Sequence, residues 1–290
     1  MRLRALILAA GAVGLFWLGA PAAVAAAGVT PPAGANDWSC KPSAAHPNPV
    51  VLVHGLGATM SENWREMSPL LASHGYCVFA LTYGRDPRAP EFGGAVPMEQ
   101  SSQELAAFVD RVLAATGAAK VDIVGHSEGS LMPDWYVKFL GGAAKVDRYV
   151  GLTPLWKGTN LAEAGTLCDL GRPSGSCQSF SATFANYCGS CPEFVRGSDF
   201  LAKLNEGGAA VPGVTYTMLI TRYDELVSPY TSGILDSATN IVVQDQCRTD
   251  YTEHAGMAFD PVTQQDVLNA LDPAHATPPA CKVVLPVVGG

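Results

Sequence analysis

The chain has 290 residues, of which 48% are hydrophobic and only 15% are charged. Acidic residues outnumber basic ones, 26 to 18, and the formal net charge is −8. Proteins that bind nucleic acids need clustered positive charge, so this composition predicts no nucleic-acid partner. The length and the apolar fraction instead predict a folded domain with a large buried core.

Residues 1–27 have the layout of a secretory signal peptide. Arg2 and Arg4 form a basic start, residues 5–18 are apolar, and residues 23–27 offer small side chains for cleavage. The alternative is an uncleaved anchor, because the apolar run is nearly long enough to cross a bilayer. We expect cleavage, and therefore a secreted protein without an integral membrane segment. Residues 28–290 then form the mature protein, an expected monomer with a formal charge of −10 (−8 minus two arginines).

All eight cysteines lie after this leader, which agrees with an exported protein that contains disulfides. Local closure favours two short pairs and leaves two longer ones for the chain ends: Cys168–Cys177, Cys188–Cys191, Cys40–Cys77 and Cys247–Cys281. The four cysteines within residues 168–191 could instead bind zinc, but a site of four thiolates suits a reducing compartment better. We therefore expect disulfides and no metal.

Apolar runs and helical patterns alternate along the rest of the chain. The core begins at residues 49–53, whose unbroken apolar run predicts a strand buried on both faces of a parallel sheet. A helix should follow, with Ser61 as its N-cap and residues 62–72 as its body. Further strands are predicted at 77–81, 121–124, 149–152, 214–221 and 241–243, and further helices at 98–115, from 131 onward and at 261–271. This alternation predicts an α/β fold with a doubly wound, mostly parallel sheet.

The strand at residues 121–124 runs directly into Gly125-His126-Ser127-Glu128-Gly129, and a helical pattern follows at once. A strand, a sharp turn with a serine at its apex and then a helix form the nucleophile elbow of α/β-hydrolases. The two glycines would let the strand and the helix approach each other, and the turn would expose the Ser127 hydroxyl. The motif alone has many chance matches, so the strand and the helix around it carry the prediction.

A serine hydroxyl is a weak nucleophile until a base, most often a histidine, removes its proton. In α/β-hydrolases the catalytic residues follow the order Ser, Asp or Glu, His along the chain. Among the six histidines, His254 lies in a loop between the last predicted strand and the last helix, so it is the predicted base. His275, in the proline-rich C-terminal arm, is the alternative. His126 adjoins Ser127 and should point away from it and pack.

The carboxylate that orients the histidine should follow a late strand, because parallel sheets present functional groups at the carboxyl ends of their strands. Asp224 is the first acidic residue after the strand at 214–221 and is the predicted acid. Glu225 is the alternative. Asp245 and Asp250 are less favoured, because they follow the next strand and lie close to the histidine in the sequence.

Two backbone N–H groups should form an oxyanion hole, one after the nucleophile and one in the loop after an early strand. Glu128 supplies the first, whatever its side chain is. Leu56 is the candidate for the second, because His54-Gly55-Leu56-Gly57 follows the first buried strand. The alternative is that these four residues form only a tight turn.

Five strings occur in this order: Val51–Gly55, Gly125–Gly129, Thr221–Tyr230, Gln244–His254 and Asn269–Pro273. Together they resemble the secreted class 2 lipases of actinobacteria, from about Asn36 to Pro273. The resemblance implies an α/β-hydrolase fold, esterase or lipase activity on acyl glycerols, and no cofactor. Position by position it implies this site: Ser127, Asp224 and His254 as the triad, with the N–H groups of Leu56 and Glu128 as oxyanion donors.

The chain departs from this family at one position of the motif. The residue after the serine is often Gln in such enzymes, whereas this chain has Glu128. A negative charge near the oxyanion would oppose its formation. Either the Glu128 side chain is turned away from the oxyanion, or the optimum is shifted.

Residues 155–205 have no clear strand pattern and should form a cap insertion over the site. Their aromatic residues either contact an acyl chain or form a satellite core under the disulfides: Trp156, Phe180, Phe184, Tyr187, Phe194 and Phe200. We predict a secreted serine esterase or lipase that hydrolyses acyl esters through an acyl-enzyme at Ser127, with a lipid substrate at a lipid–water interface. The alternatives are an acyltransferase that acts on lipid or cell-wall acceptors and a non-enzymatic binding protein with a vestigial elbow.

Overall fold

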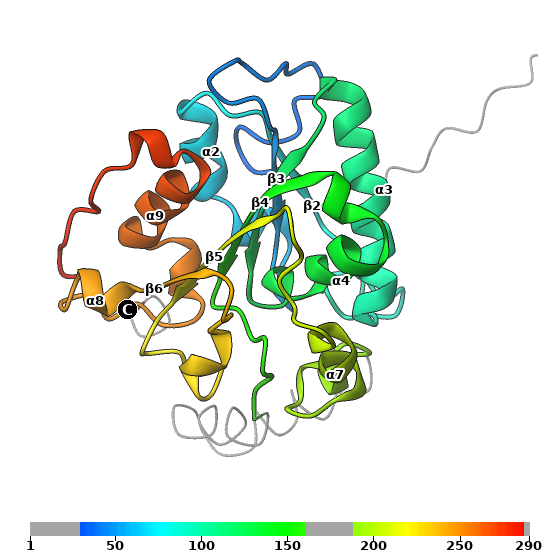
Figure 1. Ribbon diagram of the computed structural model, residues 1–290, viewed down its shortest axis with the longest axis vertical. Coiled ribbons are helices and arrows are strands. Elements are labelled where there is room, and N and C mark those ends of the chain that lie inside the picture. The colour runs from blue at the N-terminus through cyan, green and yellow to red at the C-terminus, as the bar shows by residue number, and fades with distance from the viewer. Residues whose placement is uncertain (1–29, 161–187, 287–290) are drawn as a thin grey trace, which may run out of the picture.

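The computed structural model describes residues 30–160 and 188–286. Its centre is a six-stranded sheet with helices on both faces (Figure 1). The strands lie in the order β2-β1-β3-β4-β5-β6, and every neighbouring pair is parallel, which confirms the predicted sheet. The strand bounds are Val50–Val53 (β1), Val78–Leu81 (β2), Val121–His126 (β3), Val146–Leu152 (β4), Thr215–Ile220 (β5) and Thr239–Val242 (β6). The strand order reverses between β1 and β3, and sheets of this kind bind ligands at such a switch point.

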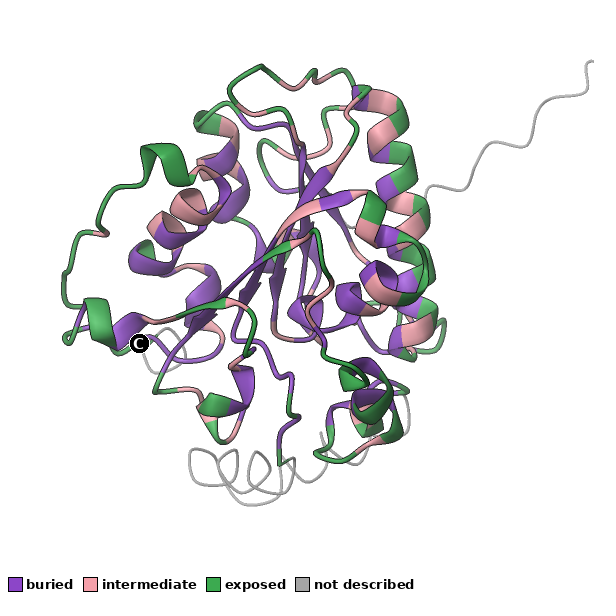
Figure 2. Ribbon diagram, in the orientation of Figure 1, coloured by how far each residue is buried: buried purple, intermediate pink, exposed green. Residues whose placement is uncertain are grey.

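Helices cover both faces of the sheet and create two cores. Their bounds are Met60–Asn63 (α1), Met67–Ser73 (α2), Met98–Thr116 (α3), Met132–Phe139 (α4), Asp199–Asn205 (α7), Val243–Gln246 (α8) and Pro261–Leu271 (α9). Val51 and Val53 face the core beneath α3 and α4, whereas Val50 and Leu52 face the core beneath α2 and α9. Successive side chains of a strand point to opposite faces, so a strand between two helical layers needs an unbroken apolar run. Figure 2 shows buried strands between helices whose outer faces are exposed.

The prediction of one helix with Ser61 as its N-cap and residues 62–72 as its body is wrong in two respects. The helix starts earlier, and the segment forms two helices. The N-cap is Thr59, which forms a capping box with Glu62, and the first helix ends at Asn63. The second helix begins at Met67, two residues before Pro69. Proline lacks an N–H and is tolerated in the first turn but not in a helix interior, so Pro69 favours a new helix start at this point.

Disulfides tie both arms of the chain to the sheet domain. Three predicted pairs are confirmed: Cys40–Cys77, Cys188–Cys191 and Cys247–Cys281. The fourth, Cys168–Cys177, lies outside the described residues. The zinc alternative is wrong for Cys188 and Cys191, because these two are bonded to each other. Within residues 30–160 and 188–286 no cluster of His, Cys, Asp and Glu has the geometry to hold a metal ion.

The described ends of the predicted cap pack against the sheet domain. Trp156, Phe194 and Phe200 are buried in the main core beneath α3 and α4 rather than in a separate satellite core, and Phe194 also reaches a cavity described below. Phe180, Phe184 and Tyr187 lie outside the described residues, as does the predicted signal peptide. None of the described helices combines the length and the apolar character needed to span a membrane.

Candidate active site

The elbow lies where β3 ends and a single helical turn, Ser127–Ser130, leads into α4. Ser127 has a φ of +56°, in the left-handed region that residues other than glycine seldom adopt. A Cβ on Gly125 would lie 1.8 Å from the Gly129 carbonyl oxygen, and a Cβ on Gly129 would lie 2.1 Å from that of Val53. Only glycine fits at these two positions, so the close approach predicted for the strand and the turn is confirmed.

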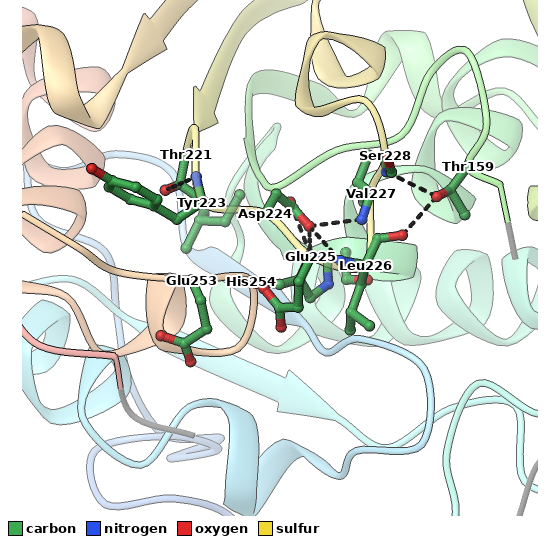
Figure 3. Close-up of polar contacts among 12 residues, drawn as sticks. Thr159, Thr221, Tyr223, Asp224, Glu225, Leu226, Val227, Ser228, Glu253 and His254 are labelled. Atoms are coloured by element: carbon green, nitrogen blue, oxygen red, sulfur yellow. Dashed lines mark hydrogen bonds and ion pairs between the residues drawn. The ribbon is translucent and has the colours of Figure 1, made fainter. Parts of the chain in front are cut away.

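His254 and Asp224 form a buried pair beyond the ends of β6 and β5. The His254 Nδ1 lies 2.9 Å from Oδ1 and 3.0 Å from Oδ2 of Asp224 (Figure 3). The two side chains are only 4% and 2% exposed. The N–H groups of Leu226 and Val227 donate to the Asp224 Oδ1 at 3.0 and 2.7 Å, and these bonds stabilise the charged carboxylate. Burial opposes protonation of His254, but the neighbouring carboxylates, chiefly Asp224, outweigh it and raise its pKa.

Ser127 and His254 line the same cavity, which has a volume of about 420 Å³. Most of its wall is apolar: Gly55, Leu56, Ala58, Leu155, Phe194, Leu226, Val227, Ala255, Ala258 and Phe259. Leu56 follows β1 in this wall, and its N–H takes part in none of the backbone hydrogen bonds of the described residues. This N–H is therefore available to a ligand. A cavity of this size and character is typical of a site for a small apolar ligand.

The structure also shows where the alternative acid and base lie. The Glu225 Oε2 accepts the backbone N–H of His254 at 3.1 Å, so this carboxylate holds the histidine loop rather than the ring. The His275 side chain is 83% exposed and pairs with Asp272. Asp245 binds Arg222 on the surface. Of these residues, only Glu225 contacts His254.

His126 contributes more than the packing role expected from the sequence. Its Nε2 lies 2.9 Å from the His254 carbonyl oxygen, and its Nδ1 lies 3.0 Å from the Asn63 Oδ1. The same Asn63 oxygen accepts the Gly55 N–H at 3.0 Å. Burial lowers the pKa of His126 to about 3, so the ring is neutral. A neutral ring carries one N–H, so it donates to one of these two oxygens and packs against the other. Asn63 and His126 thus lie between the loop after β1 and the histidine loop, and no local sequence signal indicates this arrangement.

Two threonines hold the loops that carry the acid and the histidine. Thr159 donates from Oγ1 to the Leu226 carbonyl at 2.6 Å and accepts the Ser228 N–H at 3.0 Å (Figure 3). Thr221 donates to the Thr252 carbonyl at 2.6 Å. Each bond joins segments that are far apart in the sequence, so no local sequence pattern indicates the role of either threonine.

The Glu128 side chain is turned away from the cavity. It is only 1% exposed, and its Oε2 lies 3.5 Å from the Ser190 Oγ on the opposite side of the elbow. Burial raises the pKa of this carboxyl well above its usual range. The first of the two expected outcomes for Glu128 therefore holds.

Two triacylglycerol lipases are among the curated proteins that match this chain. A triacylglycerol lipase from Burkholderia plantarii is 36% identical over 129 residues, which are 42% of this chain and 30% of the relative. A triacylglycerol lipase from Pseudarthrobacter phenanthrenivorans is 38% identical over 90 residues, which are 29% of this chain and 26% of the relative. The chain thus spans less than a third of the length of these relatives.

Solved structures agree on the fold. Aspergillus fumigatus lipase B aligns with a TM-score of 0.63 at 19% identity and covers 86% of this chain and 56% of that one. The mature form of Bacillus licheniformis lipase BlEst2 aligns with a TM-score of 0.52 at 17% identity and covers 69% of this chain and 84% of that one. These likenesses support the α/β-hydrolase fold. The family model described as lipase (class 2) matches residues 47–267, more than half of the chain, so the chain belongs to the class 2 lipase family.

Proposed function

We propose that the protein is a carboxylic ester hydrolase, a lipase or esterase that acts on acyl glycerols. The main support is one arrangement: Ser127 and His254 line a single apolar cavity, and Asp224 binds the ring nitrogen of His254. The class 2 lipase family and the names of the two relatives support the same substrate class.

The proposed reaction passes through an acyl-enzyme. The Nε2 of His254 removes the Ser127 proton as the serine oxygen attacks the ester carbonyl, while Asp224 stabilises the imidazolium that forms. The N–H groups of Leu56 and Glu128 bind the oxyanion, and one such donor contributes about 3 kcal/mol. His254 then protonates the leaving alcohol, and water repeats both steps on the acyl-enzyme.

Exposed apolar residues beside the cavity support a lipid substrate. Leu226 lies in the cavity wall and is nevertheless exposed. Tyr223 and Tyr251 are not part of the cavity wall, but they lie next to Asp224 and three residues before His254 in the chain and are exposed as well, with ring centroids 5.6 Å apart. Exposed apolar groups around a binding cavity are typical of sites that contact lipid or another apolar surface. We propose that this rim contacts the lipid–water interface.

The setting that we propose is extracellular. The signal-peptide pattern at residues 1–27 and the three disulfides support export, since disulfides persist in oxidising compartments. The mature protein would be a monomeric hydrolase domain over residues 28–290 with a cap insertion at about residues 155–205.

Replacing the nucleophile tests the proposed function. Ser127→Ala should abolish hydrolysis of a soluble p-nitrophenyl ester and labelling by a fluorophosphonate probe. Ser39→Ala removes an exposed hydroxyl and serves as the matched control. Full activity of Ser127→Ala would refute the proposal. Product analysis with an added alcohol acceptor separates the hydrolase from an acyltransferase on the same scaffold.

A further inference from the structure

The Glu128 carboxyl lies in a closed chamber behind the elbow. Three segments form its walls: the residues after β2, the loop that contains Gly94, and the loop closed by the disulfide between Cys188 and Cys191. A Cβ on Gly94 would lie only 2.8 Å from the Glu128 Oε2, so the carboxyl packs directly against this backbone. Such close packing fixes where the carboxyl can lie and excludes water from one side of it.

The hydroxyl groups around this carboxyl have already donated their hydrogens. The Tyr83 hydroxyl, which interacts with Glu128, donates to the His54 carbonyl oxygen at 2.9 Å. The Ser190 hydroxyl donates to the Gly94 carbonyl oxygen at 2.7 Å. A hydroxyl carries one hydrogen, and the shorter bonds to the two carbonyl oxygens hold it, so Ser190 is only a weak donor to the Glu128 Oε2 at 3.5 Å. A carboxylate can only accept hydrogen bonds, whereas a protonated carboxyl can donate one to either oxygen.

The other oxygen of the Glu128 carboxyl lacks a hydrogen-bond donor among the described residues. The Oε1 of Glu128 is buried and has no hydrogen-bond partner within the described part of the chain. A charged carboxylate without donors would be strongly destabilised at such a site. Burial destabilises a neutral carboxylic acid far less than a charged carboxylate.

The charged groups that face the chamber also oppose a negative charge on Glu128. Glu193, on the segment of the disulfide loop, is a second acid, and burial raises its own pKa to about 8, so it adds a negative charge beside Glu128 only at alkaline pH. Glu104, on α3, accepts the N–H of Gly84, which follows Tyr83. His54 stacks on Tyr83 with ring centroids 4.4 Å apart, and burial lowers the pKa of His54 to about 4, so it is neutral. Burial, with Glu193 adding to it, raises the pKa of Glu128 well above its usual range.

We propose that Glu128 is a neutral acid in the working enzyme and that, as a positioning residue, it ties the elbow to the oxyanion loop. The connection runs from the Glu128 carboxyl to the Tyr83 hydroxyl and from there to the His54 carbonyl, two residues before Leu56. It therefore fixes the distance between the two N–H groups of the oxyanion hole, and in this respect it rests on the proposed function. Ionisation of Glu128 would draw the hydrogens of Tyr83 and Ser190 away from their carbonyl acceptors and loosen the loop.

The test compares kcat and KM across pH for the wild type, Glu128→Gln, Glu128→Leu and Glu91→Gln on a soluble p-nitrophenyl ester. The wild type should lose kcat at alkaline pH, while circular dichroism at the same pH reports an intact fold. Glu128→Gln cannot ionise and still carries donors, so its profile, scaled to its own maximum, should lack this alkaline limb. Glu128→Leu has no donor, and its kcat should fall roughly tenfold to a hundredfold at every pH, with a smaller change in KM. Glu91→Gln, at an exposed carboxyl, should keep the wild-type profile.

Infrared spectroscopy gives a readout that does not depend on turnover. At neutral pH the carbonyl band of protonated carboxyls should be stronger in Ser127→Ala than in the Ser127→Ala/Glu128→Gln double variant, because buried acids such as Glu193 contribute to this band in both proteins and Glu128 contributes only in the first. Identical pH profiles for the wild type and Glu128→Gln, or no weakening of the band, would overturn the inference. Full activity of Ser127→Ala would overturn the proposed function instead, so the two failures are distinguishable.

Discussion

Two carboxyl groups near Ser127 are almost completely buried, yet their surroundings favour opposite charge states. Asp224 receives two backbone N–H groups and lies beside the His254 ring. Glu128 faces two hydroxyl groups whose hydrogens are held by shorter bonds to backbone carbonyl oxygens. Burial penalises the charged form of both groups, and two backbone donors bind Asp224 whereas Glu128 has only the long contact with Ser190. Burial raises the pKa of Glu128 because too few donors offset it there.

The largest effect is expected when the partner of Asp224 is removed. His254→Ala should lower kcat roughly 10⁶-fold, because the proposed base and the proposed proton donor to the leaving alcohol are lost together. His275→Ala, which removes the exposed alternative, should leave kcat close to that of the wild type. Steady-state kinetics on a soluble ester measures both variants. A severe loss in His275→Ala together with an active His254→Ala would reverse the assignment of the base.

A smaller but still large effect is expected when the charge of Asp224 is removed. Asp224→Asn should lower kcat roughly 10⁴-fold, because the amide does not stabilise the imidazolium. The nearby carboxylates raise the pKa of His254, and the base must be neutral to act, so activity rises as the pH passes this pKa. Without the Asp224 charge the pKa falls, and the acid limb of the residual activity should move to lower pH.

Asp245→Asn is the matched control for that variant, because Asp245 is an exposed carboxylate paired with Arg222. It should keep both the rate and the acid limb of the wild type. An acid limb that stays in place in Asp224→Asn would show that another group sets the pKa of His254.

The strands and the candidate catalytic residues could be predicted from the sequence alone. The strands could be predicted because burial on both faces requires unbroken apolar runs, as in β1. Ser127, Asp224 and His254 could be nominated because each follows a predicted strand in an order that the fold dictates. The break between Asn63 and Met67 does not follow from the helical pattern of residues 62–72, and the one local signal for it is Pro69, which favours a helix start just before it.

The remaining features depend on contacts between distant segments. His126 and Asn63 are 63 residues apart, and no local pattern indicates that they contact each other. The direction of the Glu128 side chain depends on Ser190, which is 62 residues away. Local patterns fix element types and motif positions, whereas the hydrogen-bond partners of a buried polar group are set by tertiary packing.

The smallest effect is expected at a third buried carboxyl, which tests the same rule away from the site. The Asp134 Oδ1 accepts the Tyr216 hydroxyl at 2.7 Å, and burial raises the pKa of Asp134 to about 7. Between the ordinary value of 3.8 and about 7 the folded state binds more protons than the unfolded state, so the free energy of unfolding falls as pH rises through this window. Asn cannot ionise, so Asp134→Asn should remove the loss of stability that Asp134 causes between pH 4 and pH 7. The free energy of unfolding should rise by about 1–3 kcal/mol at pH 8 but change little at pH 4.

Urea denaturation at both pH values measures the difference, with the exposed Asp236→Asn as control. An equal gain at both pH values would mean that Asp134 is not held neutral by its surroundings. Asp134 would then give no support to a neutral Glu128.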